Sequence, residues 1–354
     1  MANTFSIDTN KEPCPMIQNL ANTLLQQAVL LSASDVHLIP FEQKYRILLR
    51  ISGRLQFFTF LPLDNGERLL SHLKYRGFMD ISETRKPQSG SFQTTIHGNN
   101  VSVRLATIPN FRFVESMVIR VFSDQEIALF QKSSIFHKIT HHILSLAQNR
   151  TGLLLFSGAT GSGKTSSMYS LAHSLSLREP LQIITIEDPV ERPMPSFLQV
   201  QINEKAGLDY ADIIRATLRH DPDILVVGEI RDAHTAKMVI RGALTGHLVL
   251  STVHADSTYG VLSRLLELGV DQEELRQCLI GISHQRLCHL YCLFCKGRCH
   301  PLCNHLTQKR TALYEFIEKE QINQFFTTTS ELEQTNTIKN QMKKGACYGF
   351  FSPQ

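Results

Sequence analysis

The first 125 residues combine helical apolar spacing with short strand-like runs. Residues 17–31 place apolar side chains on one helical face before SASD interrupts the pattern, and the more polar segment 64–79 predicts a second helix. HGNN predicts a tight hairpin in which an asparagine adopts positive φ. The expected strands are VHLIP, YRILLRI, RLQFFTFL, FQTTI, VSVRLATI and SMVIRVF. This region is therefore predicted to be a small α+β domain, with one helix before each group of strands.

From about residue 134 the pattern changes to helical segments that alternate with short, continuously apolar runs. These runs are LLLFSG, QIITIED, ILVVGE and HLVLSTV. Continuous apolar runs between helices are typical of parallel strands buried on both faces, so the second domain is predicted to be α/β. We place the first domain at 1–125, a linker at 126–134 and the second domain at 135–354. After about residue 320 the chain turns polar, and no structure is predicted there.

Composition narrows the functional classes. Hydrophobic residues make up 42% of the chain and charged residues 19%, as in globular proteins that bury a core. The net charge of +4 comes from 36 basic and 32 acidic residues, a balance that argues against direct nucleic-acid binding. The N-terminus lacks the pattern of a signal peptide, and no apolar run approaches the roughly 18 residues of a membrane span. A cytoplasmic location, with reduced thiols, is therefore expected.

The strongest motif is GATGSGKT at 158–165, which satisfies G-x-x-x-x-G-K-[ST] between a predicted strand and a predicted helix. Its glycines let the backbone curl so that N–H groups face phosphates, and the following helix adds its positive end. Lys164 can reach the β- and γ-phosphates, and Thr165 can hold Mg²⁺. The candidate nucleotide-binding residues are Gly158, Ala159, Thr160, Gly161, Ser162, Gly163, Lys164 and Thr165.

Three further stretches place polar side chains at the ends of predicted strands. ILVVGEIRD offers Glu229 as a magnesium ligand, because acids at the carboxyl edge of a parallel sheet face the ligand crevice. ITIEDPVE carries Glu187, Asp188 and Glu191, one of which could activate water. HLVLSTVHAD places His247 before a predicted strand and His254 at its end, where a histidine could sense the γ-phosphate or hydrogen-bond a neighbouring carboxylate. The alternatives are solvated loop acids and a structural histidine, and these residues alone do not decide between them.

Together and in this order, these stretches resemble the motifs of the secretion ATPase superfamily, the motors of type II secretion, type IV pili and competence pseudopili. GATGSGKT resembles its Walker A motif, ITIEDPVE its Asp box, LRHDPDILVVGEIRD its Walker B region and GHLVLSTVHAD its His box. The likeness extends to SASDVHLIP, RKPQSGSF, VSVRLATIP and SMVIRVF in the first domain, with Ser89 where the family usually has Asp. The resemblance spans roughly residues 30–315.

The resemblance implies an α/β fold, in which a RecA-like P-loop NTPase domain follows a smaller PAS-like α+β domain. It implies a homo-hexamer that uses ATP and Mg²⁺. Arginines of an N-terminal domain complete the site in this family, and Arg104 and Arg120 occupy the matching positions. A guanidinium placed there stabilises charge on the transferring phosphoryl group. Sequence alone would leave both as ordinary strand arginines.

The same resemblance assigns roles to the acids and histidines. Glu187 is the residue expected to activate water and Glu229 the residue expected on the magnesium side, although the two roles could be exchanged. His254, and with weaker support His247, would sense nucleotide or couple subunits.

Family members act on a polytopic platform protein at the cytoplasmic face of the membrane, so peripheral membrane association is expected. The chain begins almost at its ASD segment, and this shortness resembles the competence pseudopilus ATPases of Gram-positive bacteria. The expected function is an ATPase that powers assembly of a type IV pilus-like or competence pseudopilus, or a type II secretion machine. The alternatives are a RecA-like nucleic-acid translocase or helicase, a pilus retraction ATPase, and a scaffold that binds ATP but barely hydrolyses it.

Five of the eight cysteines lie in CHLYCLFCKGRCHPLCNH, residues 288–305. Clustered cysteines in a reducing compartment indicate metal before disulfides. Assembly motors carry a tetracysteine zinc site between segments that resemble QRL and RTALYE here, and retraction motors lack it. The resemblance implies a zinc site formed by Cys292, Cys295, Cys299 and Cys303. The two pairs are closer than in relatives, so Gly297 would supply a tight turn. Reduced thiols, disulfides, or a set in which Cys288, His300 or His305 replaces one ligand remain alternatives.

Overall fold

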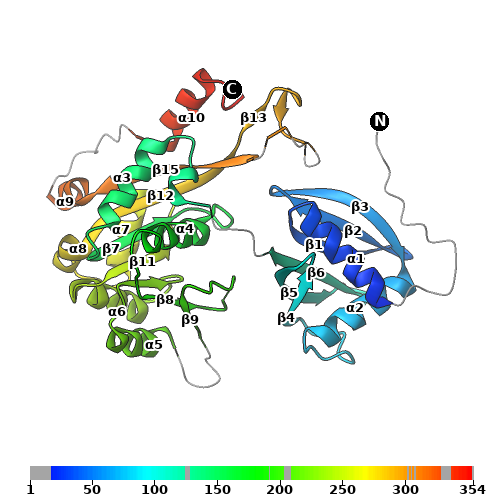
Figure 1. The fold of residues 1–354 in the computed structure, drawn as a ribbon. Coiled ribbons are helices and arrows are strands. Elements are labelled where there is room, and N and C mark those ends of the chain that lie inside the picture. Colours follow the sequence, from blue (N-terminus) through cyan, green and yellow to red (C-terminus); the bar gives the residue numbers. More distant parts are fainter. Residues whose placement is uncertain are drawn as a thin grey trace. The chain divides into compact units, whose positions relative to one another are not determined.

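The structure is a computed structural model that describes residues 17–123, 128–190, 192–202, 209–300, 303, 305–306, 308–327 and 336–352. The chain divides into two compact units between Gln125 and Glu126 (Figure 1). Each unit has its own core and is described by itself. No helix in the described ranges has both the length and the apolar character that a bilayer crossing requires.

The first unit is a six-stranded antiparallel sheet with two helices, in the strand order β3-β2-β1-β6-β5-β4. Its elements are α1 (Ile17–Leu30), β1 (Ala33–Phe41), β2 (Lys44–Ile51), β3 (Arg54–Pro62), α2 (Leu63–Arg76), β4 (Gln88–Ile96), β5 (Asn99–Pro109) and β6 (Glu115–Ser123). The predicted α+β content, with one helix before each three strands, is confirmed.

Two local predictions in this unit were wrong. The segment 32–35 does not simply separate helix from strand, because β1 begins at Ala33 and Asp35 already pairs with β2. In the β4–β5 hairpin the positive φ angles fall on His97 (50°) and Gly98 (81°), and no asparagine takes one. A two-residue turn with positive φ at both central positions suits the strand twist, and Gly98 adopts it without steric cost. Asn99 and Asn100 therefore belong to β5.

Alternation along the strands gives this sheet one apolar face and one polar face. Residues such as Val103 and Leu105 are buried with α1 and α2 in a single core. Arg104 lies between them in sequence and therefore points to the opposite face, because successive strand residues alternate. The polar face of the first unit thus carries the strand arginines.

The second unit contains a seven-stranded sheet in the order β15-β12-β7-β11-β10-β8-β9. Its elements are η1 (Phe130–Lys132), α3 (His137–Ala147), β7 (Gly152–Ser157), α4 (Lys164–Ser176), β8 (Ile183–Glu187), β9 (Leu198–Gln201), α5 (Tyr210–Thr217), η3 (Leu218–His220), β10 (Ile224–Val227), α6 (Ala233–Leu244), β11 (Leu248–Val253), α7 (Thr258–Glu267), α8 (Gln272–Cys278), β12 (Leu279–His289), β13 (Tyr291–Cys292), β14 (Gly297–Arg298), β15 (Arg310–Glu318), α9 (Lys319–Thr327) and α10 (Ile338–Cys347).

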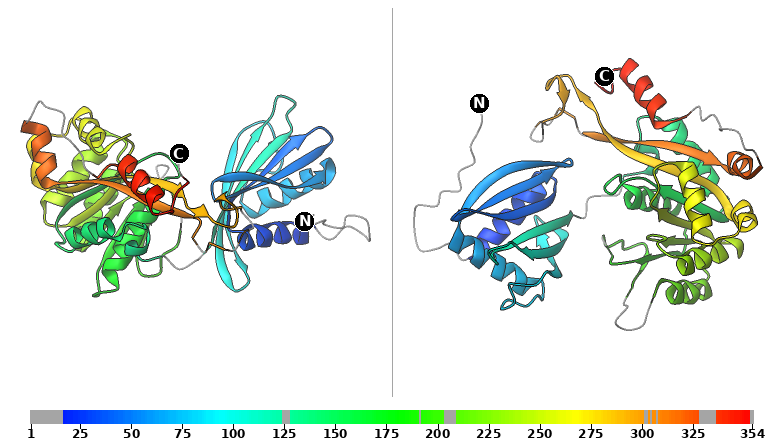
Figure 2. Two further views of the ribbon diagram at one scale, coloured as in Figure 1. Left: turned by 90° about the horizontal axis from the view of Figure 1, so that it is seen from above. Right: turned by 180° about the vertical axis from the view of Figure 1, so that it is seen from behind.

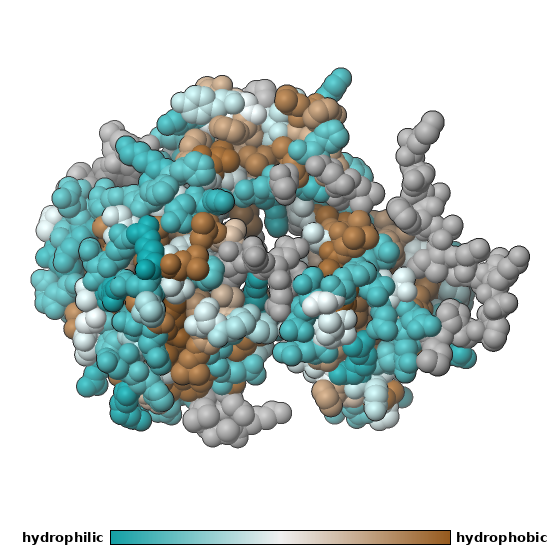
Figure 3. All heavy atoms as spheres, in the orientation of Figure 1, coloured by the Kyte–Doolittle hydropathy of each residue, from teal (hydrophilic) through white to brown (hydrophobic). Residues whose placement is uncertain are grey.

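The central strands are parallel and buried on both faces, as predicted. In β7, Leu153 and Leu155 pack with α5 to α9, whereas Leu154 and Phe156 pack with α3 and α4. β15 is antiparallel to β12, and the small β13–β14 hairpin follows β12 (Figures 1 and 2). Hydrophilic side chains cover much of the helical surface in Figure 3, as expected for helices that bury one stripe against a sheet. The polar end of the chain, left without a prediction, contains α9 and α10.

Candidate active site and cysteine cluster

The phosphate loop connects β7 to α4 in the second unit, as the motif predicts. Gly158, Gly161 and Gly163 all adopt positive φ, at 137°, 76° and 89°. A Cβ added to Gly158 would lie 2.4 Å from the carbonyl oxygen of Gln285, so only glycine fits there. The loop therefore has the curled backbone that phosphate binding requires.

The side chain of Lys164 lies over this loop. Its Nζ donates hydrogen bonds to the carbonyl oxygens of Gly158 (2.8 Å) and Ala159 (3.2 Å). Burial lowers the pKa of Lys164, and the negative charge of Glu229 opposes that shift. The ammonium group is thus held at the loop, with a carboxylate within electrostatic reach. Thr165 is the second residue of α4 and is half-buried.

Sheet topology brings the other predicted strand-end residues to the same edge. The strand order β7-β11-β10-β8 places the phosphate loop next to His254, then Glu229, then Glu187. All four strands are parallel, so their carboxyl ends meet at one edge, where α/β proteins bind ligands.

Glu229 is the centre of a charged group at this edge. One of its carboxylate oxygens lies 3.1 Å from Nε2 of His254, and the other accepts a 2.9 Å hydrogen bond from Nε of Arg231. Arg231 also lies 3.7 Å from Asp188. The hydrogen bond from Arg231 to Glu229 and the nearby negative charges raise the pKa of Arg231 above its usual value. Burial has a smaller, opposite effect. His254 and Glu229, predicted separately, are therefore direct partners.

Glu187 occupies a different environment. Its side chain is 5% exposed, and Oε1 accepts hydrogen bonds from Thr185 Oγ1 (2.7 Å) and Gln199 Nε2 (3.0 Å). Glu229, by contrast, is 19% exposed. Two carboxylates in such different surroundings are suited to different tasks. Glu191 lies outside the described residues.

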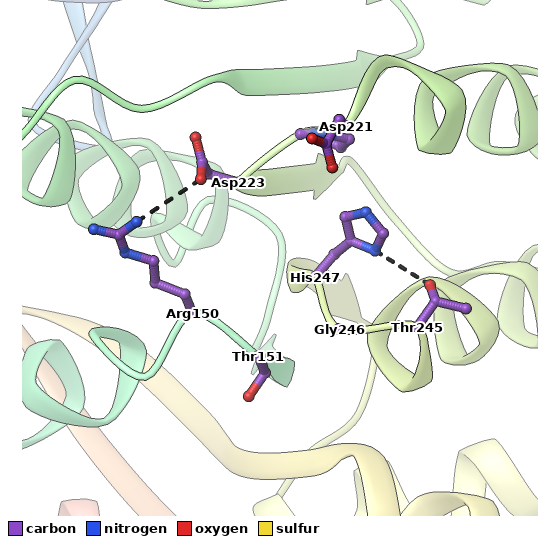
Figure 4. A pocket seen from close by; sticks show the side chains of 8 residues that line it. Arg150, Thr151, Asp221, Asp223, Thr245, Gly246 and His247 are labelled. Carbon is purple, nitrogen blue, oxygen red and sulfur yellow. Dashed lines mark hydrogen bonds and ion pairs between the residues drawn. The ribbon is translucent and has the colours of Figure 1, made fainter.

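His247 is placed away from this edge. It directly precedes β11, whereas His254 directly follows it, so the two histidines lie at opposite ends of the strand, roughly 20 Å apart. His247 lines a pocket of about 300 Å³ with Arg150 and Asp223, and its Nδ1 lies 3.2 Å from the Thr245 hydroxyl (Figure 4). Within this unit, His247 therefore does not reach the phosphate loop.

Arg104 and Arg120 lie in the first unit, on adjacent strands. Nε of Arg120 donates a 2.8 Å hydrogen bond to Asp35, a buried carboxylate that is also 3.6 Å from Arg50. The guanidinium carbon of Arg104 lies 5.1 Å from the centre of the Phe122 ring. Because the two units are described separately, the role of Arg104 and Arg120 at the phosphate loop stays a prediction.

Sequence reasoning missed four residues around the loop. Arg231 is visible in GEIRD as a basic residue between acids, although the prediction used only the glutamate. Gln285 and Tyr314 lie in the QRL and RTALYE segments, which served only to bracket the cysteines, and Gln199 gave no signal. A polar residue in a strand pattern indicates a solvent-facing position by default. Gln285 and Tyr314 are instead 1% and 0% exposed.

The four predicted cysteines converge within the second unit. Sγ atoms of Cys292, Cys295, Cys299 and Cys303 all lie within 4.8 Å of one another. Four sulfurs bound tetrahedrally to zinc at about 2.3 Å would lie about 3.8 Å apart, a separation compatible with sulfurs that all lie within 4.8 Å of one another. The seven described cysteines are all free thiols, so the disulfide alternative finds no support among them.

Among the described residues, the group of converging ligand atoms includes none of the substitutes considered, Cys288, His300 and His305, although the backbone N–H of His300 donates a 3.4 Å hydrogen bond to Sγ of Cys295. Cys288 is packed among apolar side chains with Leu313 and Phe351, and the ring of His305 lies against Phe294. The β13–β14 hairpin turn is made by residues 293–296, with positive φ (51°) at Lys296, the first residue between the two cysteine pairs. Gly297, which was expected to supply the turn, follows it as the first residue of β14 and also has a positive φ (157°).

Comparison with known proteins places these features in a wider group. The family model of type II/IV secretion system proteins matches residues 10–348. The chain is 38% identical over 341 residues to the competence protein ComGA of Bacillus subtilis, covering 95% of this chain and 96% of that one. It is 38% identical to the type IV pilus assembly ATPase TfpB of Acinetobacter baylyi, covering 86% and 52%. The crystal structure of the pilus retraction motor PilT with bound ADP matches with a TM-score of 0.67 at 25% identity, covering 94% of each chain.

Proposed function

This chain belongs to the type II/IV secretion system protein family, and we propose that it assembles a competence pseudopilus for DNA uptake. Its relatives establish the broader activity: it is a secretion or pilus-assembly motor ATPase. The observation that carries the finer proposal is the 38% identity to ComGA along almost the whole of both chains.

ATP hydrolysis follows from the residues at the carboxyl edge of the second sheet. The curled backbone and Lys164 would bind the phosphates, and Thr165 and Glu229 would hold Mg²⁺, which would neutralise phosphate charge. Glu187 activates the attacking water, and its buried hydrogen bonds from Thr185 and Gln199 orient the carboxylate. His254 contacts Glu229 and senses the state of the site through it.

Mechanical work requires more than one domain. We propose a homo-hexamer in which Arg104 and Arg120 add positive charge to a nucleotide site formed by the second unit. A guanidinium that must approach the γ-phosphate links hydrolysis to domain position. The hexamer works at the cytoplasmic face of the membrane, bound to a polytopic platform protein that it drives.

We further propose that the cysteine cluster binds zinc. The donor set supports this, because four convergent thiol sulfurs are the ligands of structural zinc sites. The cluster also favours assembly over retraction, since retraction motors lack it. No observation here specifically favours a nucleic-acid translocase or a scaffold that barely hydrolyses ATP.

Transformation in the organism that encodes the chain tests the proposal. Deletion of the gene should abolish uptake of added DNA and the formation of pseudopili. Re-expression of the wild-type chain should restore both, and the Lys164→Ala variant at equal abundance should restore neither. Normal transformation in the deletion strain, with loss of protein secretion instead, would identify a secretion motor.

A further inference from the structure

Gln285 is a buried strand residue whose amide group faces the phosphate loop. Its side chain is 1% exposed, and Nε2 donates a 2.7 Å hydrogen bond to the carbonyl oxygen of Ser162. The other amide atom, Oε1, is buried without a partner among the described residues, as is Oγ of Ser162. Burying an unpaired amide oxygen is costly. An apolar side chain at position 285 would avoid that cost. The hydrogen bond to the loop is therefore what a glutamine adds at this position.

Peptide geometry gives that bond a consequence for the loop. The Ser162 carbonyl and the Gly163 N–H belong to one planar trans peptide and point in opposite directions. Because Gln285 holds the Ser162 carbonyl towards β12, the Gly163 N–H points away from β12, to the opposite side of this peptide. This N–H begins the α4 end of the motif, where phosphate-binding loops present their donors.

A second buried side chain holds the helix that follows the loop. Tyr314 is the direct cross-strand partner of Gln285 on β15 and is fully buried. Its hydroxyl lies 2.9 Å from Oγ of Ser167 on α4 and 2.9 Å from Oγ of Ser133. The N–H of Ser167 in turn donates to the carbonyl of Gly163. One cross-strand pair therefore contacts both the loop and the first turn of its helix.

We propose that Gln285 and Tyr314 are positioning residues for nucleotide binding, which fix the phosphate loop in its binding conformation from behind. They act through the loop backbone and the first turn of α4. The proposal rests on ATP binding at this loop, the activity stated above. It predicts that both residues affect affinity for the phosphates more than the chemical step.

The test measures binding of ADP with magnesium by titration calorimetry, on the full-length chain. Gln285→Met keeps the volume and removes the donor, and the Kd for ADP should rise about tenfold. Tyr314→Phe removes only the hydroxyl, and the Kd should rise about threefold. In ATP hydrolysis, KM should rise in parallel while kcat stays within about twofold.

Gln341→Met is the matched control. Gln341 is also buried, with an unpartnered Oε1, and its Nε2 donates to the Tyr314 carbonyl (2.6 Å) rather than to the loop. Equal weakening of ADP binding by Gln341→Met would indicate general loosening and overturn the proposal, as would an unchanged Kd in Gln285→Met. If Gln285→Met does not fold, Tyr314→Phe decides by the same criterion. ADP binding needs no hydrolysis, so an inactive wild-type enzyme would contradict the proposed function alone.

Discussion

Arg104 and Arg120 are direct cross-strand partners on β5 and β6, so both side chains stand on the same face of the first sheet. That face is opposite to the one covered by α1 and α2. Arg120 is held by the buried carboxylate of Asp35, whose register places it directly beside Arg120 on β1. The two cations are thus presented together from one rigid sheet, which suits a shared role at a phosphate group.

The first prediction concerns Arg104→Ala. If this arginine completes the nucleotide site, ATP turnover should fall about a hundredfold, the usual effect of removing one group that stabilises transition-state charge. The chain should stay folded, because the side chain lies outside the core. Steady-state ATPase assays with circular dichroism measure both.

Arg46→Ala is the control for this experiment. Arg46 lies on β2, 5.3 Å from the ring of Phe41, as Arg104 lies 5.1 Å from Phe122. The Arg46→Ala variant should keep ATP turnover within about twofold of wild type. Full activity in the Arg104 variant would contradict the shared site.

The second prediction separates the two carboxylates. Glu187→Gln should bind ADP normally and lose nearly all turnover, because the amide cannot accept the proton of water. Glu229→Gln should instead raise the magnesium concentration needed for half-maximal activity, since a ligand charge is lost. Magnesium titrations of both variants reveal the roles. A shifted magnesium requirement in Glu187→Gln, with none in Glu229→Gln, would show that they are exchanged.

The third prediction concerns zinc. Protein purified without chelator should carry about one zinc per chain, and less than about half would contradict the site. Cys292→Ser and Cys299→Ser should each reduce the content strongly. Cys347→Ser should leave it unchanged, because Cys347 is exposed on α10 and outside the cluster. Elemental analysis by mass spectrometry provides the measurement.

The fourth prediction is a pH dependence of stability that arises at His284. Its Nδ1 lies 3.1 Å from the Ser157 hydroxyl, and burial lowers its pKa from 6.5, against the opposing effect of Glu315 and Asp256. As the pH falls below about 6.5, the unfolded state takes up a proton that the folded state resists. The free energy of unfolding of the second unit should therefore decrease from pH 7 towards pH 5.

Urea unfolding of His284→Gln at several pH values tests this cause. The variant should show a flatter dependence than wild type between about pH 5 and 7. His141→Gln, a change at an exposed position of α3, should keep the wild-type slope. An unchanged slope in His284→Gln would assign the effect to other groups.

Much of the second unit was predictable because its motifs are local. GATGSGKT fixes a strand, a loop and a helix in consecutive residues, and the apolar runs predict strands buried on both faces. A carboxylate partner for His254 was foreseen, but its identity as Glu229 was not predictable, because it depends on β11 lying next to β10 in the sheet. The same topology separates His247 from the site, although only six residues lie between it and His254 in the sequence.

Buried polar residues were the main feature that the sequence patterns did not predict. Gln285 and Tyr314 lie about thirty positions apart, and their contacts with the loop follow from the antiparallel pairing of β12 and β15. A sequence pattern assigns a strand glutamine to the surface unless a partner is known. In the β4–β5 hairpin the error was smaller, since HGNN offers several residues that tolerate positive φ and the register alone decides which do.

The central claim is that this chain hydrolyses ATP at the loop 158–165. Its most direct test is phosphate release by the purified wild-type chain and by Lys164→Ala, with ATP and magnesium at saturation and with membranes that contain the platform protein. Wild type should release phosphate steadily. The rate of phosphate release by Lys164→Ala should be at least about a hundredfold lower, while circular dichroism shows that this variant is still folded. Equal rates from the two proteins would contradict the account.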